Sequence, residues 1–273
     1  MPQAKKIFIE RLFINSFGVN VEIQVDEESL VEAAKKAVHV ALAGRFRWIS
    51  PLSTQHIFTL RQRRAGRIDL IHNSELKYSN LETPAALERF SSDLRLSVAE
   101  FAPEHAFIHA GAVGWKDKGI IFPARSFRGK SSLTAALVRR GARYYSDEYA
   151  ILDKRGFLHP FPKDLSLRGI KDDFSQVEHS VASLGGRAGS RPIPVKLILI
   201  TEFQKGAKWR PREMNSGTAL LEVLNNSVSI RRNPEFVLPA ISLIGYSSRA
   251  VKSKRGEADI TAPMILDLLD QID

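Results

Sequence analysis

The side chains best suited to chemistry lie near the middle of the chain, in a short segment that holds a glycine, a lysine and serines. Residues 124–131 read A-R-S-F-R-G-K-S, which departs from the phosphate-loop pattern G-x-x-x-x-G-K-[ST] at the first glycine. Where such a loop turns into a helix, its main-chain N–H groups and the positive end of the helix dipole point at one place. The pattern therefore predicts a polyphosphate site. Its expected cofactor-binding residues are Ala124, Arg125, Ser126, Phe127, Arg128, Gly129, Lys130, Ser131 and Ser132.

Four side chains in and after this segment suit a nucleotide bound together with a divalent metal ion. Lys130 would lie on the outer phosphates and neutralise their charge, and the Ser131 hydroxyl would be a ligand for Mg²⁺, which prefers hard oxygen donors. After the helix, a short predicted strand ends in Asp147 and Glu148. Their carboxylates could meet the same metal ion.

Other interpretations of this segment stay open. Ala124 replaces the first glycine, and Phe127-Arg128 place bulk where small residues usually let the backbone wrap the phosphates. In the alternative, Gly-Lys-Ser is an ordinary turn from strand to helix, with Ser131 as the helix N-cap. The prediction for Asp147 and Glu148 meets a difficulty, because the side chains of neighbouring strand residues point to opposite faces of the sheet. Both carboxylates can reach one ligand only if the strand has already ended or bulged.

Hydrophobic periodicity predicts the elements that would position these residues. The apolar run 120–122 precedes the segment as a buried strand, and apolar residues at helical spacing follow it until Gly141, a typical helix end. The other elements expected in this half are a hairpin of 149–152 and 157–161, a long loop over 172–194, a central strand over 195–200, a helix capped by Ser216-Gly217, a helix after Pro234 interrupted near Pro239, a strand near 250–252 and a last helix over 261–272.

The first hundred residues predict a separate α+β unit. Residues 7–25 alternate apolar and polar side chains and suggest a hairpin that turns around Asn15 to Gly18. A helix over 26–44, a strand pair within 55–71 and a helix from Thr83 follow, with no cluster of reactive side chains. We therefore expect an α/β protein with two domains: a small N-terminal α+β domain over 1–102 and a nucleotide-binding domain over 103–273.

The second half also carries a resemblance to a known family. The similar features are His109 on the strand before the loop, the loop itself, the helix that ends Arg-Arg-Gly, and the run S-D-E-Y-A-I-L from Ser146. Together they resemble the catalytic core of the HPr serine kinase family, which shares an ATP-binding core with phosphoenolpyruvate carboxykinases. The resemblance covers residues 107–168 well, the rest of this half weakly and the first hundred residues hardly at all. It implies a mixed-sheet domain with a phosphate loop.

The resemblance also implies roles by position. His109 matches the family's active-site histidine, and Lys130 and Ser131 match its phosphate and magnesium residues. Asp147 and Glu148 match its acidic pair, in which the first acid is associated with the metal and the second takes the proton from the acceptor serine. Glu148 stands where that family has aspartate. The metal ligands implied are thus Ser131 and Asp147.

The predicted function is an ATP- and Mg²⁺-dependent kinase that phosphorylates a hydroxyl, in the first place a serine of a protein or peptide. Arg168 is the candidate for a cation that contacts phosphate and completes the catalytic set, with Arg210 behind it. The longer side chain of Glu148 displaces the carboxylate, and a misplaced base is costly to rate. A catalytically weak or inactive nucleotide-binding regulatory protein is therefore the alternative, and a basic scaffold without nucleotide is a third. The HPr kinases resembled here are oligomeric, so a homo-oligomer is compatible with the prediction.

Length, composition and net charge exclude several classes of protein and of site. The chain has 273 residues, which suits one large or two modest domains, and it has no cysteine, which excludes disulfides and thiolate metal sites. Neither a signal peptide nor an apolar run of the ~18 residues needed to span a membrane is recognisable, so we expect a cytoplasmic protein with no membrane partner. The formal net charge is +10, but the basic residues are scattered and no nucleic-acid-binding motif accompanies them, so nucleic acid is not favoured as a partner.

Overall fold

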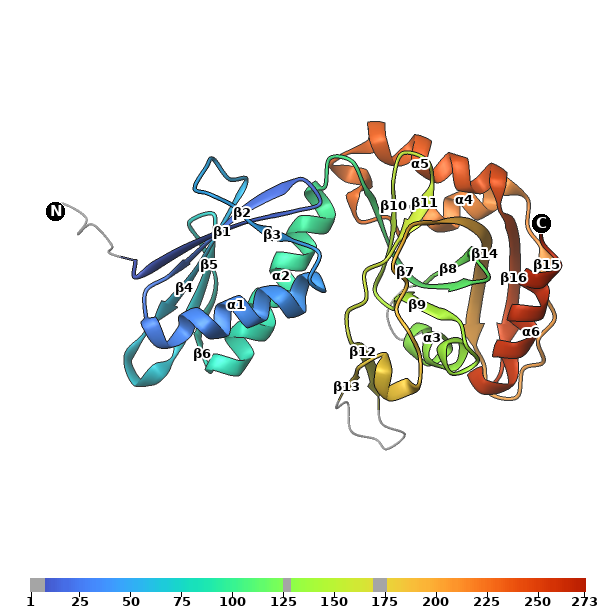
Figure 1. The fold of residues 1–273 in the computed structure, drawn as a ribbon, viewed down its shortest axis with the longest axis horizontal. Coiled ribbons are helices and arrows are strands. Elements are labelled where there is room, and N and C mark those ends of the chain that lie inside the picture. The colour runs from blue at the N-terminus through green and yellow to red at the C-terminus, as the bar shows by residue number, and fades with distance from the viewer. Residues whose placement is uncertain (1–7, 125–128, 169–175) are drawn as a thin grey trace. The chain divides into compact units, whose positions relative to one another are not determined.

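The computed structural model describes residues 8–124, 129–168 and 176–273 (Figure 1). The contacts between residues divide the chain into two compact units, residues 1–103 and 104–273. The protein is a mixed α/β protein, and each unit is built on a mixed sheet. Among the described residues, no helix combines the length and the hydropathy that a membrane crossing requires.

The first unit is a six-stranded sheet with two helices packed against it. Its elements are β1 (Glu10–Ser16), β2 (Val19–Val25), α1 (Glu28–Leu42), β3 (Arg47–Trp48), β4 (His56–Gln62), β5 (Ile68–His72), β6 (Glu75–Leu81) and α2 (Thr83–Phe101). The strand order is β3-β1-β2-β4-β5-β6, with β2 and β4 parallel and the other neighbours antiparallel. The predicted hairpin of β1 and β2, the pair β4 and β5, and both helices are confirmed.

The second unit contains an eight-stranded sheet and a separate two-stranded hairpin. Its elements are β7 (Ala106–Trp115), β8 (Lys118–Pro123), α3 (Lys130–Arg139), β9 (Arg143–Ser146), β10 (Tyr149–Leu152), β11 (Phe157–His159), β12 (Leu165–Arg168), β13 (Gln176–His179), β14 (Ile193–Phe203), β15 (Arg212–Glu213), α4 (Ser216–Leu224), α5 (Pro234–Ser247), β16 (Arg249–Arg255) and α6 (Ala258–Asp270). The order in the large sheet is β11-β10-β7-β8-β14-β16-β15, and β9 also pairs with β7. The predicted central strand is β14, which runs parallel to both β8 and β16.

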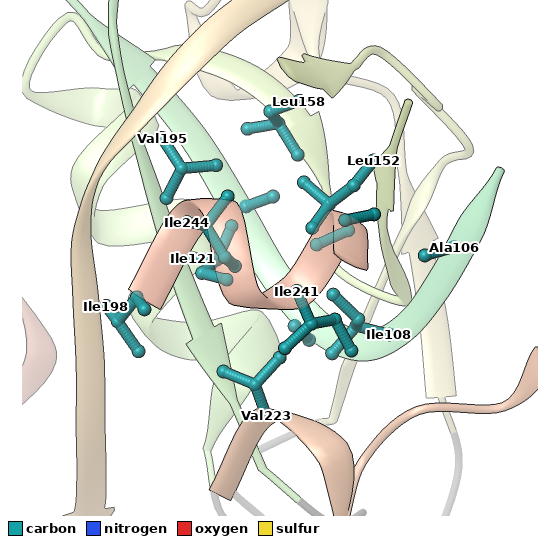
Figure 2. Close-up of a cluster of buried hydrophobic side chains, with 14 of the residues drawn as sticks. Ala106, Ile108, Ile121, Leu152, Leu158, Val195, Ile198, Val223, Ile241 and Ile244 are labelled. Atoms are coloured by element: carbon teal, nitrogen blue, oxygen red, sulfur yellow. The ribbon is translucent and has the colours of Figure 1, made fainter. Parts of the chain in front are cut away.

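Helices cover both faces of the second sheet, so its central strands are apolar on both sides. One core packs α4 and α5 against the sheet, and Figure 2 shows Ile241 and Ile244 of α5 among side chains that include Ile121 and Ile198. The other core packs α3 and α6 against the opposite face and includes Ile120, the neighbour of Ile121 in β8. Continuous apolar runs such as 120–122 result from this double burial.

Several predicted details of the second unit are wrong. Helix α5 continues through Pro239, which stands in its second turn and removes only one N–H. Helix α4 is capped by the Asn215 side chain, which accepts from the Thr218 N–H at 2.9 Å, and not by Ser216. The region expected to be one long loop contains β13 and a 3₁₀ turn at Ala182–Leu184.

Candidate phosphate site at the start of helix α3

The junction between β8 and α3 ends in a left-handed glycine. Gly129 has φ 82° and is the N-cap of α3, so the first helical residue is Lys130. A Cβ at this position would lie 2.5 Å from Nη2 of Arg255, so a glycine is required both by its backbone conformation and by the space available. The predicted loop residues Arg125, Ser126, Phe127 and Arg128 lie outside the described residues. Ala124 and Gly129 mark the two ends of that segment.

The Ser131 side chain is hydrogen-bonded to Asp147, one of the two predicted acids. Its hydroxyl donates to Oδ2 of Asp147 at 2.9 Å. Ser131 is the second residue of α3 and Gly129 is the N-cap, so the alternative in which Ser131 caps the helix is wrong. Its hydroxyl is turned away from the helix backbone toward a carboxylate on another element.

The two predicted acids lie in the connection between β9 and β10, where the strand has already ended. The hydroxyl oxygen of Ser146, the last residue of β9, accepts hydrogen bonds from the N–H groups of Glu148 at 3.1 Å and Tyr149 at 2.9 Å. The Glu148 carbonyl accepts from the Ala110 N–H on β7 at 3.1 Å. Because neither acid is inside a strand, the alternation of strand side chains does not force their carboxylates to opposite faces.

Asp147 is held from its other side by Tyr144, a residue that the sequence interpretation passed over. The Tyr144 hydroxyl lies 2.9 Å from Oδ1 of Asp147 and 2.7 Å from the Lys163 carbonyl, and it accepts from the Asp147 N–H at 3.2 Å. Burial raises the pKa of Asp147, and the positive charge of Lys163 opposes that rise most strongly. The signal in the sequence was weak, because a tyrosine in a strand is most often a core residue.

Lys130 is almost wholly buried at the start of α3. Its ammonium donates to the Ala124 carbonyl at 2.7 Å, across the two ends of the predicted loop. Burial lowers the pKa of Lys130 to about 8, and the charges of Asp147 and Glu148 partly oppose this. The ammonium therefore shares its surroundings with both acids and also donates to a backbone carbonyl.

His109 lies on β7, directly opposite Tyr149 in the pairing with β10. Its carbonyl accepts from the Ala124 N–H at 3.4 Å, so the strand that carries the histidine is bonded to the start of the predicted loop. Burial, followed by the charge of Lys130, lowers the pKa of His109 to about 4, with Glu148 opposing. The imidazole is consequently neutral near pH 7 and can orient a ligand by a hydrogen bond but carries no charge.

The remaining predicted residues lie in different surroundings. Ser132 is exposed on α3, and Arg210 is exposed beside β16, where its N–H donates to the Ser253 hydroxyl at 3.0 Å. Arg168 ends β12, and its backbone is paired with Gln176, but its side chain is outside the described part of the structure. The arginine that does reach the junction is Arg255, whose Nη2 donates to the Gly129 carbonyl at 2.8 Å. Nothing in the sequence distinguishes it from the other scattered basic residues.

The oxygen atoms at this site fit a magnesium ion. Two adjacent ligands of octahedral Mg²⁺, each about 2.0–2.1 Å from the ion, lie about 2.9 Å apart. The Ser131 Oγ–Asp147 Oδ2 distance is also 2.9 Å. In the described parts of the chain, no group of three or more His, Asp and Glu residues could hold a metal ion by itself. A protein that offers Mg²⁺ only two oxygens suits an ion whose other ligands are water and phosphate.

Comparison with known proteins gives a weak structural similarity. The sequence matches no family model and no curated protein. Among solved structures, the chain is similar to the HPr(Ser) kinase/phosphatase from Coxiella burnetii, with a TM-score of 0.33 and 14% sequence identity. That similarity covers 60% of this chain and 93% of the other.

Proposed function

We propose that this protein is an ATP- and Mg²⁺-dependent phosphotransferase that transfers the γ-phosphoryl group to a hydroxyl, in the first place a serine of a protein or peptide. The observation that carries the proposal is the 2.9 Å contact between Ser131 and Asp147 at the start of α3. This contact brings together two hard oxygen donors, which suit a metal ion. They lie beside a lysine and a helix N-terminus, which suit the phosphates that the metal ion accompanies.

Each residue then has a defined task. Lys130 and the first N–H groups of α3 neutralise the negative charge on the phosphates, and Ser131 with Asp147 holds the metal ion, which supplies charge neutralisation between the phosphates when bound. Tyr144 keeps the Asp147 carboxylate in place through the 2.9 Å contact to Oδ1. The neutral His109 orients the group being transferred by a hydrogen bond.

Glu148 is the base of the proposed reaction. The acceptor oxygen forms a bond to the γ-phosphorus, the bond from that phosphorus to the bridging oxygen of ATP breaks, and ADP leaves with the electron pair. Glu148 takes the proton of the acceptor hydroxyl. The Glu148 side chain extends from a turn fixed by the Ser146 hydroxyl and by Ala110 of β7, which limits the positions that its carboxylate can reach.

The metal-binding part of the proposal is tested by calorimetric titration of ATP with and without Mg²⁺. S131A and D147N remove one donor each, and D164N is the matched control because Asp164 is exposed in the neighbouring segment. We expect the Mg²⁺-dependent gain in ATP affinity to fall at least about tenfold in S131A and D147N, and to stay at the wild-type value in D164N. An unchanged gain in both site variants would exclude this pair as metal ligands.

A second function is favoured by the Ala124 position. Ala124 replaces the first glycine of the phosphate-loop pattern, and its carbonyl already accepts a hydrogen bond from Lys130 at 2.7 Å. Both features suit a protein that binds a nucleotide without turning it over. Transfer of label from γ-labelled ATP to serine-containing peptides, with E148Q as the control, separates the two functions. Tight binding without hydrolysis or transfer by the wild-type protein would favour the regulatory function.

A further inference from the structure

The most deeply buried cation of the described second unit is an arginine that the proposed reaction has not yet used. Arg255 is the last residue of β16 and is 2% exposed. Its Nη2 donates to the Gly129 carbonyl at 2.8 Å, and its Nη1 donates to the Gly256 carbonyl at 3.0 Å. The guanidinium also lies 5.6 Å from the centre of the Phe203 ring. These contacts place a positive charge directly against the N-cap of α3.

This charge has no carboxylate partner among the described residues. Arg255 forms none of the ion pairs found there, and its Nε is buried without a hydrogen-bond partner. Burial lowers the pKa of Arg255, with only Glu257 acting in the opposite direction. A buried ion of this kind is strongly unfavourable unless an opposite charge is supplied.

The surroundings of Arg255 add to this excess of positive charge. The N-terminus of α3 is the positive end of a helix dipole, where anions are stabilising and cations are not. Lys130 occupies the first position of the same helix and is itself buried. If Arg255 served only to join β16 to α3 through backbone carbonyls, a neutral donor would do so without the cost of a buried charge. The arrangement is explained if an anion binds at the same junction.

We propose that Arg255 is a positioning residue of a polyphosphate site: it holds the Gly129 carbonyl at the start of α3 and supplies a buried positive charge that a bound polyphosphate neutralises. This inference rests on the proposed function for the kind of ligand, but it requires no phosphoryl transfer. It assigns to Arg255 the cationic role that the sequence suggested for Arg168 and Arg210.

The test uses inorganic tripolyphosphate as the probe and the full chain. The affinity for tripolyphosphate is measured by calorimetric titration at low and at high salt. The proteins compared are the wild type, R255M, R255K and the control K254M. Lys254 precedes Arg255 on β16 and is exposed, so K254M removes the same charge from the surface. We expect R255M to bind at least about tenfold more weakly, because a buried positive charge beside the phosphates is lost. R255K should lie between R255M and the wild type, and K254M should match the wild type. R255M should also show a weaker salt dependence.

The outcomes separate this inference from the kinase proposal. A purely structural arginine would lower the melting temperature of R255M without changing the affinity of the folded protein, and that result would overturn the inference. If R255M does not fold, R255K decides, because wild-type affinity in R255K contradicts a role for the guanidinium. Absence of tripolyphosphate binding by the wild-type protein also overturns it. Wild-type binding that depends on Arg255, but without any phosphoryl transfer, would reject the kinase and leave this inference standing.

Discussion

The candidate site concentrates charged residues in a buried place. Lys130, Asp147 and Arg255 are each less than a tenth exposed. Burial works against the charged form of all three, lowering the pKa of the two cations and raising that of the carboxyl. Such groups reduce the stability of the fold, and natural proteins retain them at sites where a ligand or a reaction uses the charge.

The titration of Lys130 gives a prediction at this scale. Its pKa in the folded protein is about 8, against an ordinary value of 10.5. Between these values the unfolded chain binds more protons than the folded one, so the free energy of unfolding contributed by Lys130 rises with pH across this window. A bound polyphosphate favours the charged form. We therefore expect proton uptake on binding near pH 8–9 and an affinity for tripolyphosphate that falls as the pH rises above about 8.

Calorimetry in two buffers of different ionisation enthalpy measures this proton uptake directly. The control is K130R, because a guanidinium stays charged over the whole window. K130R should take up no proton at this position, and its affinity should be flat between pH 7 and pH 9 apart from the titration of the ligand. Equal proton uptake by both proteins would show that another group is responsible.

At the scale of elements, the site depends on where two strands end. Strand β8 ends at Pro123 and α3 begins at Lys130, whereas β9 ends at Ser146, directly before the acidic pair. The hydroxyl of Ser146 terminates β9 by accepting from two successive N–H groups, those of Glu148 and Tyr149. One buried hydroxyl therefore holds the backbone turn that carries both acids.

Ser146 provides the prediction at this scale. S146A leaves two N–H groups without their acceptor, so we expect a loss of about 1–3 kcal/mol in the free energy of unfolding, measured by urea denaturation. Because Asp147 is then less fixed, the Mg²⁺-dependent gain in ATP affinity should fall as well. The exposed Ser190 gives the control S190A, which should change neither quantity. A destabilised S146A with an unchanged magnesium response would show that the turn contributes to stability alone.

At the scale of the whole molecule, the chain consists of two compact units that each have their own sheet. All described residues of the candidate site belong to the second unit, residues 104–273. That unit buries apolar side chains on both faces of its sheet, which is the construction of a domain that can fold independently.

Independent folding of the second unit can be tested with a fragment that contains this unit alone. We expect a fragment of residues 104–273 to unfold in a single cooperative transition and to bind ATP with Mg²⁺ within about threefold of the full chain, a difference below 1 kcal/mol. Circular dichroism during thermal unfolding and calorimetric titration provide the two measurements. A fragment that folds but no longer binds would show that residues 1–103 contribute to the site.

Local features of the fold could be predicted well from the sequence. The alternation in residues 7–25, the apolar runs of β8 and β14 and the helix that ends at Gly141 all reflect periodicity or turn chemistry that a few neighbouring residues specify. The edge strand β6 is absent from the prediction because most of its residues are exposed and its apolar alternation is limited to Leu76 and Tyr78. The predicted interruption at Pro239 is wrong because the local rule against proline in helices does not account for its position near the start of α5.

The order of the candidate site's parts can be predicted along the chain: a buried strand, a glycine-lysine-serine junction, a helix, and two acids after the next strand. Which atoms come into contact depends on the fold. Ser131 and Asp147 are 16 residues apart, and Gly129 and Arg255 are 126 apart. Contacts over such separations depend on how β9 and β16 are placed around α3 by the packing of a shared core. No local pattern distinguishes Arg255 from the exposed basic residues beside it, because its role is created by burial.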